Sequence, residues 1–411
     1  MQKIDFFRDA RTDLAGPLAG VRVLETTTTW AGPMCAAILA DFGADVIKIE
    51  VPGGEVNRRL PPILPGSTIS FAHGTVNRNK RSLCLDVRSP EGRDVFLRLA
   101  KTADVVVENF KAGTMDRYGL GYEAVRAVKP DIIYVSITGW GQYGPYENRP
   151  GYDPVAQAMS GFVSMNGSAD GPPTKAATFL GDDLGGLHGA LGALAALRHR
   201  DQTGEGQHVD VALLDALLFQ SNGLPTLGAM GIEPRRMGNE FGFAVPASVF
   251  QCKDGPVYVG VLLDAHWKIM ARTIGHPELA DDPGFLTGRD RSRNRDACNA
   301  MLAAWLAERT RTDVMELFER LGLAIAPVNS YTESARDPQV AERDMLQPTT
   351  LEDGASAPIV GPVAKFSRTP TCIRSGAPAL GSHTEEILEE IGVDAATRRA
   401  LEEKGVIGCR R

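Results

Sequence analysis

Two neighbouring aspartates stand where a helical pattern begins, and they are the residues of this sequence best suited to chemistry. Asp182 and Asp183 lie in Leu-Gly-Asp-Asp-Leu-Gly-Gly, which spans 180–186. An aspartate at a helix start is usually only a cap. The free N–H groups of a helix N-terminus also stabilise an ionised carboxylate, which can attack an activated acyl group. The same groups could hold an oxyanion during acyl transfer, and the residues alone do not choose between the two aspartates.

A long Gly- and Ala-rich pattern follows the aspartates and predicts a helix over 182–200. Glycines at 185, 186, 189 and 192 are expected to let another backbone approach this helix closely. Near the aspartates, the same small residues would also admit a bulky acyl thioester.

Basic residues are the second feature that suggests a ligand. Residues 77–81 read Asn-Arg-Asn-Lys-Arg, and Arg88 and Arg117 each follow an expected strand. A solvated surface is the default interpretation of such charges, but Arg and Lys also supply charge-assisted hydrogen bonds to phosphates. The pattern is consistent with a polyphosphate cofactor. The net charge of −7 argues against binding of nucleic acid.

Several common kinds of site are not expected. The first strand-turn-helix, residues 24–33, lacks Gly-x-Gly-x-x-Gly, so NAD and FAD are not predicted ligands. The seven histidines and six cysteines show no metal-ligand spacing, so no metal site is predicted. The scattered cysteines, Cys409 among them, are typical of free thiols in a reducing, cytoplasmic protein. No signal peptide and no membrane span is expected.

Strand and helix patterns alternate over the first 150 residues. The pattern predicts helices at 31–42 and 89–101, and strands at 21–25, 46–50, 82–87, 105–107 and 132–137. Continuous apolar strands joined by helices predict an α/β fold with an open, doubly wound parallel sheet covered on both faces. Ligands in such folds bind outside the carboxyl ends of the strands.

A second, smaller α+β domain is expected further along. A strand at 207–213 continues the large domain, and the strand pair 249–250 and 257–261 opens the small one, with helices at 264–274, 293–308 and 312–322. C-terminal helices are expected at 383–392 and 395–404. The predicted boundaries are 1–210 for the first part of the large domain, 211–245 for a linker, 246–330 for the small domain, 331–365 for an irregular return linker and 366–411 for the C-terminal part of the large domain.

The order of the short motifs resembles the class III CoA-transferase family from about Pro17 to about Gly405. The motifs that carry the resemblance are 17–24, 31–33, 43–50, 79–83, 107–110, 151–153, 180–182 and 203–207. The resemblance implies a Rossmann-like large domain built from both ends of the sequence and a small domain between them. It also implies an interlocked, ring-like homodimer.

The resemblance assigns roles to single residues. The family nucleophile falls on Asp182, which resolves the choice between the two aspartates. Coenzyme A, present as acyl-CoA substrate and not as a permanently bound cofactor, is expected to contact Trp30, Ala31, Leu85, Val87, Arg88, Asn109, Phe110, Arg117, Tyr152 and Asp153. Arg58 and Arg59 are the candidates for binding the distal carboxylate of a dicarboxylic acid.

The implied activity is transfer of CoA from a donor, expected to be succinyl-CoA, to a small carboxylic or dicarboxylic acid through anhydride and aspartyl-CoA thioester intermediates. An acyl-CoA isomerase or racemase of the α-methylacyl-CoA type is the alternative. It is disfavoured because related racemases carry a histidine where this chain has Tyr152. Trp30 stands where formyl-CoA:oxalate transferases carry glutamine, which argues against oxalate. A non-catalytic acyl-CoA-binding protein is a third interpretation.

Overall fold

The computed structural model describes residues 1–408, which form two compact units. Unit 1 comprises Met1–Phe162, Lys175–Met230 and the described residues from Gln339 onward, and unit 2 comprises Val163–Thr174 and Gly231–Pro338. Residues 163–174 were predicted in the large domain and 231–245 in a linker, but both group with unit 2. Cys409 and the end of the predicted C-terminal segment lie outside the described residues.

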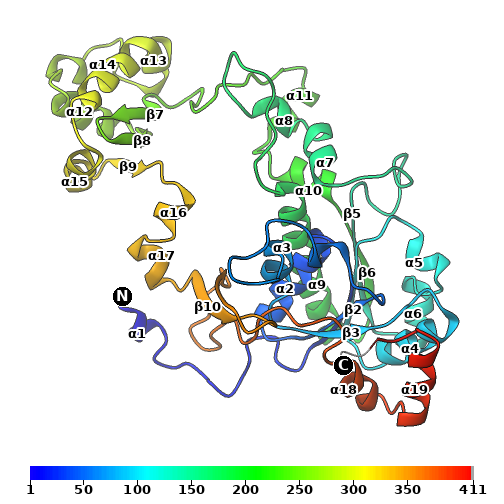
Figure 1. The fold of residues 1–411 in the computed structure, drawn as a ribbon. Helices are drawn as coiled ribbons and strands as arrows, with labels where there is room; N and C mark the ends of the chain where they lie inside the picture. Colours follow the sequence, from blue (N-terminus) through cyan, green and yellow to red (C-terminus); the bar gives the residue numbers. More distant parts are fainter. Residues whose placement is uncertain (409–411) are drawn as a thin grey trace. The chain divides into compact units, whose positions relative to one another are not determined.

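A six-stranded parallel sheet forms the centre of unit 1, in the order β3-β2-β1-β4-β5-β6 (Figure 1). The strands are β1 (Arg22–Thr26), β2 (Asp45–Glu50), β3 (Lys80–Cys84), β4 (Val105–Glu108), β5 (Ile133–Thr138) and β6 (Gln207–Ala212). The order reverses between β1 and β4, so their carboxyl ends lie side by side at the point where such sheets bind ligands. The predicted doubly wound fold is confirmed.

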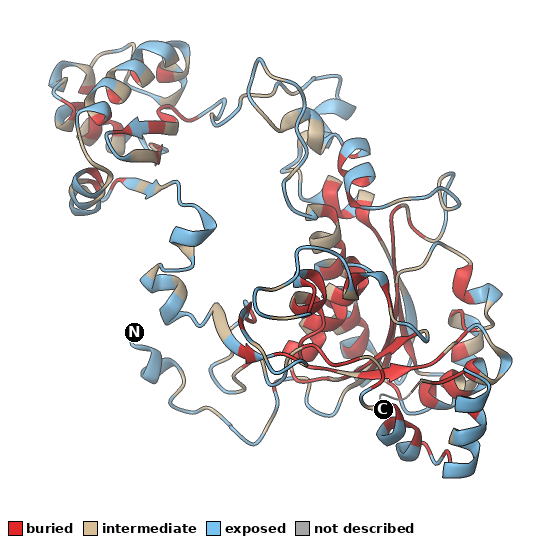
Figure 2. Cartoon of the chain, in the orientation of Figure 1, coloured by how far each residue is buried: buried red, intermediate tan, exposed pale blue. Residues whose placement is uncertain are grey.

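Helices cover both faces of this sheet because successive strand residues point to opposite sides. Val23, Val105 and Val135 pack on one face against α2 (Ala31–Asp41) and α9 (Leu180–Thr203). Leu24 and Val106 pack on the other face, beneath α4 (Pro90–Ala100), α6 (Tyr122–Val128), α18 (Thr384–Glu390) and α19 (Ala395–Glu403). Figure 2 shows β1 to β5 and the inward sides of these helices as largely buried, whereas the edge strand β6 is mostly exposed.

The glycines of α9 serve packing between helices. A Cβ atom added to Gly186 would lie 2.7 Å from the main-chain oxygen of Ala31, and one added to Gly185 would meet the side chain of Leu213. The predicted close approach of another backbone is therefore confirmed at Gly186. The expectation that these glycines make room for an acyl thioester is wrong, because Gly185 and Gly186 are buried against protein atoms.

β3 and part of the predicted return linker differ from the sequence prediction. β3 begins at Lys80 and ends at Cys84, so Leu85 and Val87 follow the strand and do not belong to it. Part of the predicted irregular return linker is an antiparallel hairpin, β10 (Leu346–Thr350) with β11 (Ser356–Val360). Proline is unfavourable in a strand because it has no N–H to donate. Pro348 and Pro358 are opposite each other here, so the two missing donors affect only one pair of residues in the hairpin.

Unit 2 packs helices against a small antiparallel sheet, β7 (Ala247–Cys252), β8 (Gly255–Gly260) and β9 (Ala324–Pro327). Trp267 and Phe318 are fully buried in its core. Its main helices are α12 (Asp264–Thr273), α13 (Gly288–Arg293), α14 (Arg295–Ala307) and α15 (Arg311–Leu321).

The remaining short helices of the chain are α1 (Lys3–Phe6), α3 (Phe71–Val76), α5 (Thr114–Arg117), α7 (Asp153–Met159), α8 (Phe162–Met165), α10 (Leu213–Phe219), α11 (Leu224–Ala229), α16 (Tyr331–Ser334), α17 (Pro338–Glu342) and the 3₁₀ turns η1 (Val56–Arg58) and η2 (Pro277–Ala280). No described helix combines the length and the apolar character that a membrane span requires.

Candidate active site

The start of α9 is capped by a residue from another helix. Asp182 is the third residue of α9, and Phe179 at the cap position offers no side-chain hydrogen bond. Instead, Oδ1 of Asp153, the buried first residue of α7, accepts the main-chain N–H groups of Gly181 (2.6 Å) and Asp182 (3.3 Å). Oδ2 of Asp153 accepts a bond from Gln157 at 2.7 Å. The expectation that free N–H groups would stabilise the Asp182 carboxylate is therefore wrong.

Asp182 is a half-buried carboxylate that accepts no hydrogen bond from any residue in the described chain. Burial, and then the negative charges of Asp153 and Asp183, raise the pKa of Asp182 to about 7. A helix N-terminus alone would lower that pKa. The loss of water and the two nearby charges therefore outweigh the helix, and near pH 7 the site holds an anion with little stabilisation.

Asp183 differs from its neighbour because it has a partner. Its Oδ1 accepts a hydrogen bond of 2.6 Å from the indole N–H of Trp30. Burial raises the pKa of Asp183, and the bond from Trp30 opposes that shift. The ring of Trp30 also lies 5.3 Å from that of Phe179, which precedes α9. The structure thus distinguishes the two aspartates, which the residues alone did not: Asp183 has a hydrogen-bond partner and Asp182 has none among the described residues.

The loop that carries Trp30 follows β1 and is held from the end of β4. The side-chain oxygen of Asn109 accepts the N–H of Thr28, and its amide donates to the Thr28 carbonyl, both at 2.8 Å. Ala31 then begins α2, whose first turn touches α9 at Gly186. Among the predicted CoA contacts, Trp30 and Asp153 bond the start of α9 directly, Ala31 meets α9 at Gly186, and Asn109 holds the loop that carries Trp30. Tyr152, beside Asp153, is 63% exposed.

The other predicted CoA contacts have different surroundings. Leu85 and Val87 are buried in the hydrophobic core, so their side chains do not line a site. Phe110 is partly buried against the same core. The exposed Arg88 forms an ion pair of 2.7 Å with Asp86. Arg117 is exposed and donates to Thr114 at 2.8 Å.

Arg58 does not face an open site. Its guanidinium makes two hydrogen bonds to Glu50, at 2.8 and 2.6 Å, and reaches the carbonyl of Pro378. Although Glu50 is buried, Arg58 and Lys48 hold its pKa at about 2. The Arg58 guanidinium is therefore already paired with a carboxylate of its own chain, which makes Arg58 the weaker of the two candidates for a substrate carboxylate. Arg59 is exposed, and among the described residues its side chain donates to the carbonyl of Gly53 alone, so its role stays a prediction.

A cluster of buried charges beneath the Trp30 loop was missed in the sequence. Lys48 Nζ lies 3.0 Å from Glu25 and 3.0 Å from Glu55, and Lys80 Nζ lies 2.7 Å from Glu25. All four side chains are buried. Despite that burial, the two lysines hold the pKa of Glu25 below its ordinary value. Glu25, Lys48 and Lys80 lie on the neighbouring strands β1, β2 and β3, and the available signal was Lys48 between two apolar residues in the middle of β2.

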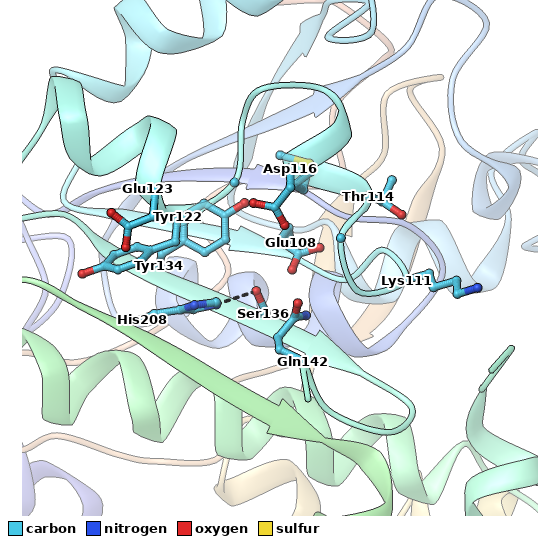
Figure 3. Close-up of a pocket in the computed structure, with 13 residues that line it drawn as sticks. Glu108, Lys111, Thr114, Asp116, Tyr122, Glu123, Tyr134, Ser136, Gln142 and His208 are labelled. Atoms are coloured by element: carbon cyan, nitrogen blue, oxygen red, sulfur yellow. Dashed lines mark hydrogen bonds between the residues drawn. The ribbon is translucent and has the colours of Figure 1, made fainter. Parts of the chain in front are cut away.

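A cavity of about 240 Å³ lies beside β4, β5 and β6, on the face covered by α4 and α6 and not on the face covered by α9 (Figure 3). Glu108, only 4% exposed, lines it with Asp116 and with Ser136, whose hydroxyl lies 2.9 Å from His208 Nε2. Burial raises the pKa of Glu108 to about 7. None of the predicted site residues lines this cavity.

Within residues 1–408, no group of three or more His, Cys, Asp or Glu side chains could hold a metal ion. Fold and site together define a doubly wound α/β protein with a half-buried carboxylate, Asp182, at the start of α9.

Comparison with known proteins identifies the family. Residues 18–384 match CoA-transferase family III. The chain is 38% identical over 382 residues to the succinyl-CoA–L-malate CoA-transferase beta subunit of Chloroflexus aurantiacus, covering 91% of this chain and 94% of that one. It is 37% identical over 394 residues to the succinyl-CoA:mesaconate CoA-transferase of Haloarcula hispanica, covering 93% and 98%. A solved CAIB/BAIF family protein from Brucella suis superposes with a TM-score of 0.81 at 34% identity, over 92% of this chain and all of that one.

The chain belongs to CoA-transferase family III and is a transferase enzyme. Substrates of enzymes in this family are CoA thioesters, which agrees with the expectation of acyl-CoA as substrate.

Proposed function

We propose that this enzyme moves CoA from an acyl-CoA donor to a small carboxylic acid, with Asp182 as the nucleophile. The observation that carries the proposal is the half-buried Asp182 carboxylate, which has no hydrogen-bond partner in the described chain and a pKa of about 7. Burial and two neighbouring charges raise the energy of this anion, and acylation of its oxygen removes the charge. Asp183 is the poorer nucleophile because Trp30 already holds its carboxylate.

The reaction would proceed through four acyl transfers. An oxygen of Asp182 attacks the thioester carbonyl of the donor, which breaks the C–S bond, expels CoA as its thiolate and leaves a mixed anhydride of Asp182 and the donor acid. The thiolate attacks the aspartyl carbonyl, which forms an aspartyl-CoA thioester and releases the donor acid. The acceptor carboxylate displaces the thiolate to give a second anhydride. The thiolate then attacks the acceptor acyl carbon, which frees Asp182. Water must be kept away because anhydrides hydrolyse readily.

Succinyl-CoA is the donor we propose, with a C4–C5 dicarboxylic acid as acceptor. The names of the Chloroflexus and Haloarcula relatives support this choice, since both specify succinyl-CoA and a four- or five-carbon acid for those proteins. Arg59 is the remaining candidate for the distal carboxylate. We further propose cytoplasmic function and the interlocked homodimer, for which light scattering after size exclusion is the test; a monomer would contradict it.

Trapping of the intermediate tests the role of Asp182. We expect that incubation with succinyl-CoA followed by hydroxylamine converts Asp182 to its hydroxamate, which peptide mass spectrometry would locate. Asp182→Asn should abolish both the hydroxamate and CoA transfer to malate or mesaconate. Asp183→Asn is the matched control, because its amide oxygen can still accept the Trp30 bond, and it should keep the hydroxamate at Asp182.

Two results would count against the proposal. A hydroxamate on another residue, or transfer activity that survives Asp182→Asn, would exclude Asp182 as nucleophile. If succinyl-CoA leaves the chain unmodified, a panel of other acyl-CoA donors decides whether only the donor is wrong. Product formed from an acyl-CoA without any free acceptor acid would indicate an isomerase or racemase.

A further inference from the structure

A turn in an unfavourable backbone conformation directly precedes the Trp30 side chain. Thr29 has a φ of 62°, in the left-handed region that a β-branched residue rarely adopts. Such a conformation persists only where surrounding groups hold it, and residues of this kind cluster at functional sites. The contacts of Thr29 therefore show which residues the turn depends on.

Two buried side chains hold the main chain of Thr29 from the segment after β2. The N–H of Thr29 donates to Glu55 Oε2 at 2.7 Å, and its carbonyl accepts a hydrogen bond from the amide of Asn57. Glu55 and Asn57 are 7% and 2% exposed. Both groups of one peptide residue are thus fixed by side chains that lie 26 and 28 positions away in the sequence.

Glu55 is itself held by charge. Its second oxygen, Oε1, lies 3.0 Å from the buried ammonium of Lys48, and its main-chain N–H donates to Glu50 at 3.2 Å. Lys48 also donates to the carbonyl of Thr27 at 3.3 Å. One lysine therefore fixes both ends of the turn, through a carbonyl on one side and through Glu55 on the other. A desolvated ion pair of this kind is rigid because neither partner can turn to water.

The turn determines where Trp30 lies. Since Trp30 follows Thr29 and precedes α2, its position depends on the Thr29 backbone, and its indole N–H reaches Asp183 at 2.6 Å. Asp183 is in turn one of the two charges that raise the pKa of Asp182. A continuous set of contacts thus runs from Lys48 through Glu55, Thr29 and Trp30 to the aspartate pair.

We infer that Glu55 is a positioning residue: it holds the left-handed turn at Thr29 and thereby places Trp30 against the acidic pair at the start of α9. The inference rests on the proposed function of Asp182. Asn57 shares the task from the carbonyl side. Neither residue was predicted as part of the site.

Substitution of Glu55 with rescue at Thr29 tests this role. Glu55→Gln removes the ion pair with Lys48 that fixes the side chain, so its amide can turn away from Thr29, and it should lower the single-turnover rate of hydroxamate formation at Asp182 by about ten- to a hundredfold. Thr29→Gly in the same chain should recover a large part of that rate, because glycine adopts the left-handed conformation without a clamp. A residue needed only for stability would show no such rescue.

Glu25→Gln is the matched control. Glu25 pairs with the same Lys48 and is also buried, but it does not touch the main chain of Thr29. Its loss should not be rescued by Thr29→Gly. If Glu55→Gln does not fold, Asn57→Ala removes the other clamp without altering the Lys48 pair, and Thr29→Gly should rescue it too.

A second readout does not need activity. The contribution of Trp30 to fluorescence, obtained by subtracting the spectrum of the Trp30→Phe chain, should shift to longer wavelength with Glu55→Gln and return with Thr29→Gly. An unshifted Trp30 emission, or a rate that Thr29→Gly does not recover, would overturn the role of Glu55. Transfer activity in Asp182→Asn would instead overturn the proposed function and leave the fluorescence test of Glu55 standing.

Discussion

Asp153 acts on the start of α9 in two opposite ways. Its carboxylate accepts the N–H groups of Gly181 and Asp182 and so completes the helix. The same charge lies close enough to Asp182 to raise the pKa of that carboxyl group. The positive end of the helix dipole therefore stabilises Asp153, and Asp182 is left as the less stable anion.

Removal of the Asp153 charge should move the pH dependence of the reaction. Asp182 must be ionised to attack, so kcat/KM should rise through the free-enzyme pKa near 7. Asp153→Asn keeps an acceptor for the Gly181 N–H but removes a like charge, which favours the ionised form of Asp182. The acidic limb of the kcat/KM profile should therefore move to lower pH.

Asp201→Asn is the control for that profile. Asp201 is exposed near the far end of α9, so its charge should leave the limb in place. An Asp153→Asn limb that stays fixed or moves to higher pH would contradict the assignment of the limb to Asp182.

Two helices pack closely at the candidate active site because one of them has a glycine, which lacks a side chain, at the point of contact. α9 and α2 touch where Gly186 faces the carbonyl of Ala31, and that contact sets the distance between α9, which carries Asp182, and the helix that begins after Trp30. The packing of these two helices is therefore part of the site.

Gly186→Ala should separate the two helices. The added methyl group would lie 2.7 Å from a main-chain oxygen that cannot rotate away, so we expect a loss of about 1–3 kcal/mol in the free energy of unfolding, measured in urea. Gly228→Ala in α11 is the matched change, because nothing lies within 4 Å of its added Cβ; it should be neutral or stabilise by up to about 1 kcal/mol. Equal effects of the two substitutions would contradict this account.

Elements were predictable where the local pattern is strong. β4 and β5 are fully buried apolar strands, and their runs of Val and Ile predict them directly. β9 was missed because Ala-Ile-Ala-Pro has little strand preference of its own and pairs only because β8 provides a partner.

Resemblance to the family could assign Asp182, but not the cap from Asp153 or the Glu55 clamp on Thr29. Those contacts join residues 26 to 29 positions apart, and no local pattern records them.

The molecule as a whole divides into units of unlike construction. The hydrophobic core of unit 2 is drawn from one continuous stretch between Val245 and Ile325. Unit 1 needs three separate segments, and its C-terminal helices contribute Ile387 and Leu401 to the same core as Leu24. Each unit has its own core, so their stabilities should be separable.

A fragment of residues 240–330 should fold by itself. It contains the core of unit 2, with Trp267 fully buried, and we expect a near-ultraviolet circular dichroism signal that is lost in one cooperative thermal transition. Leu302→Ala, which removes a fully buried side chain, should lower the midpoint through a loss of about 2–5 kcal/mol. A fragment without that signal, or one that melts gradually, would show that unit 2 depends on the rest of the chain.

The three-part construction of unit 1 has a consequence for synthesis on the ribosome. Cys84 bonds Thr384 through its N–H, Asp86 bonds the carbonyl of Val406, and Arg22 and Arg81 reach Glu390. The edge strand β3 and one face of the sheet therefore cannot complete their contacts until α18 and α19 have been synthesised. All of unit 2 is translated before that. At ordinary ribosomal elongation rates that delay is on the order of ten seconds. For that period the nascent chain exposes an apolar sheet face, so its yield in a cell should depend on chaperones that bind the chain before translation ends.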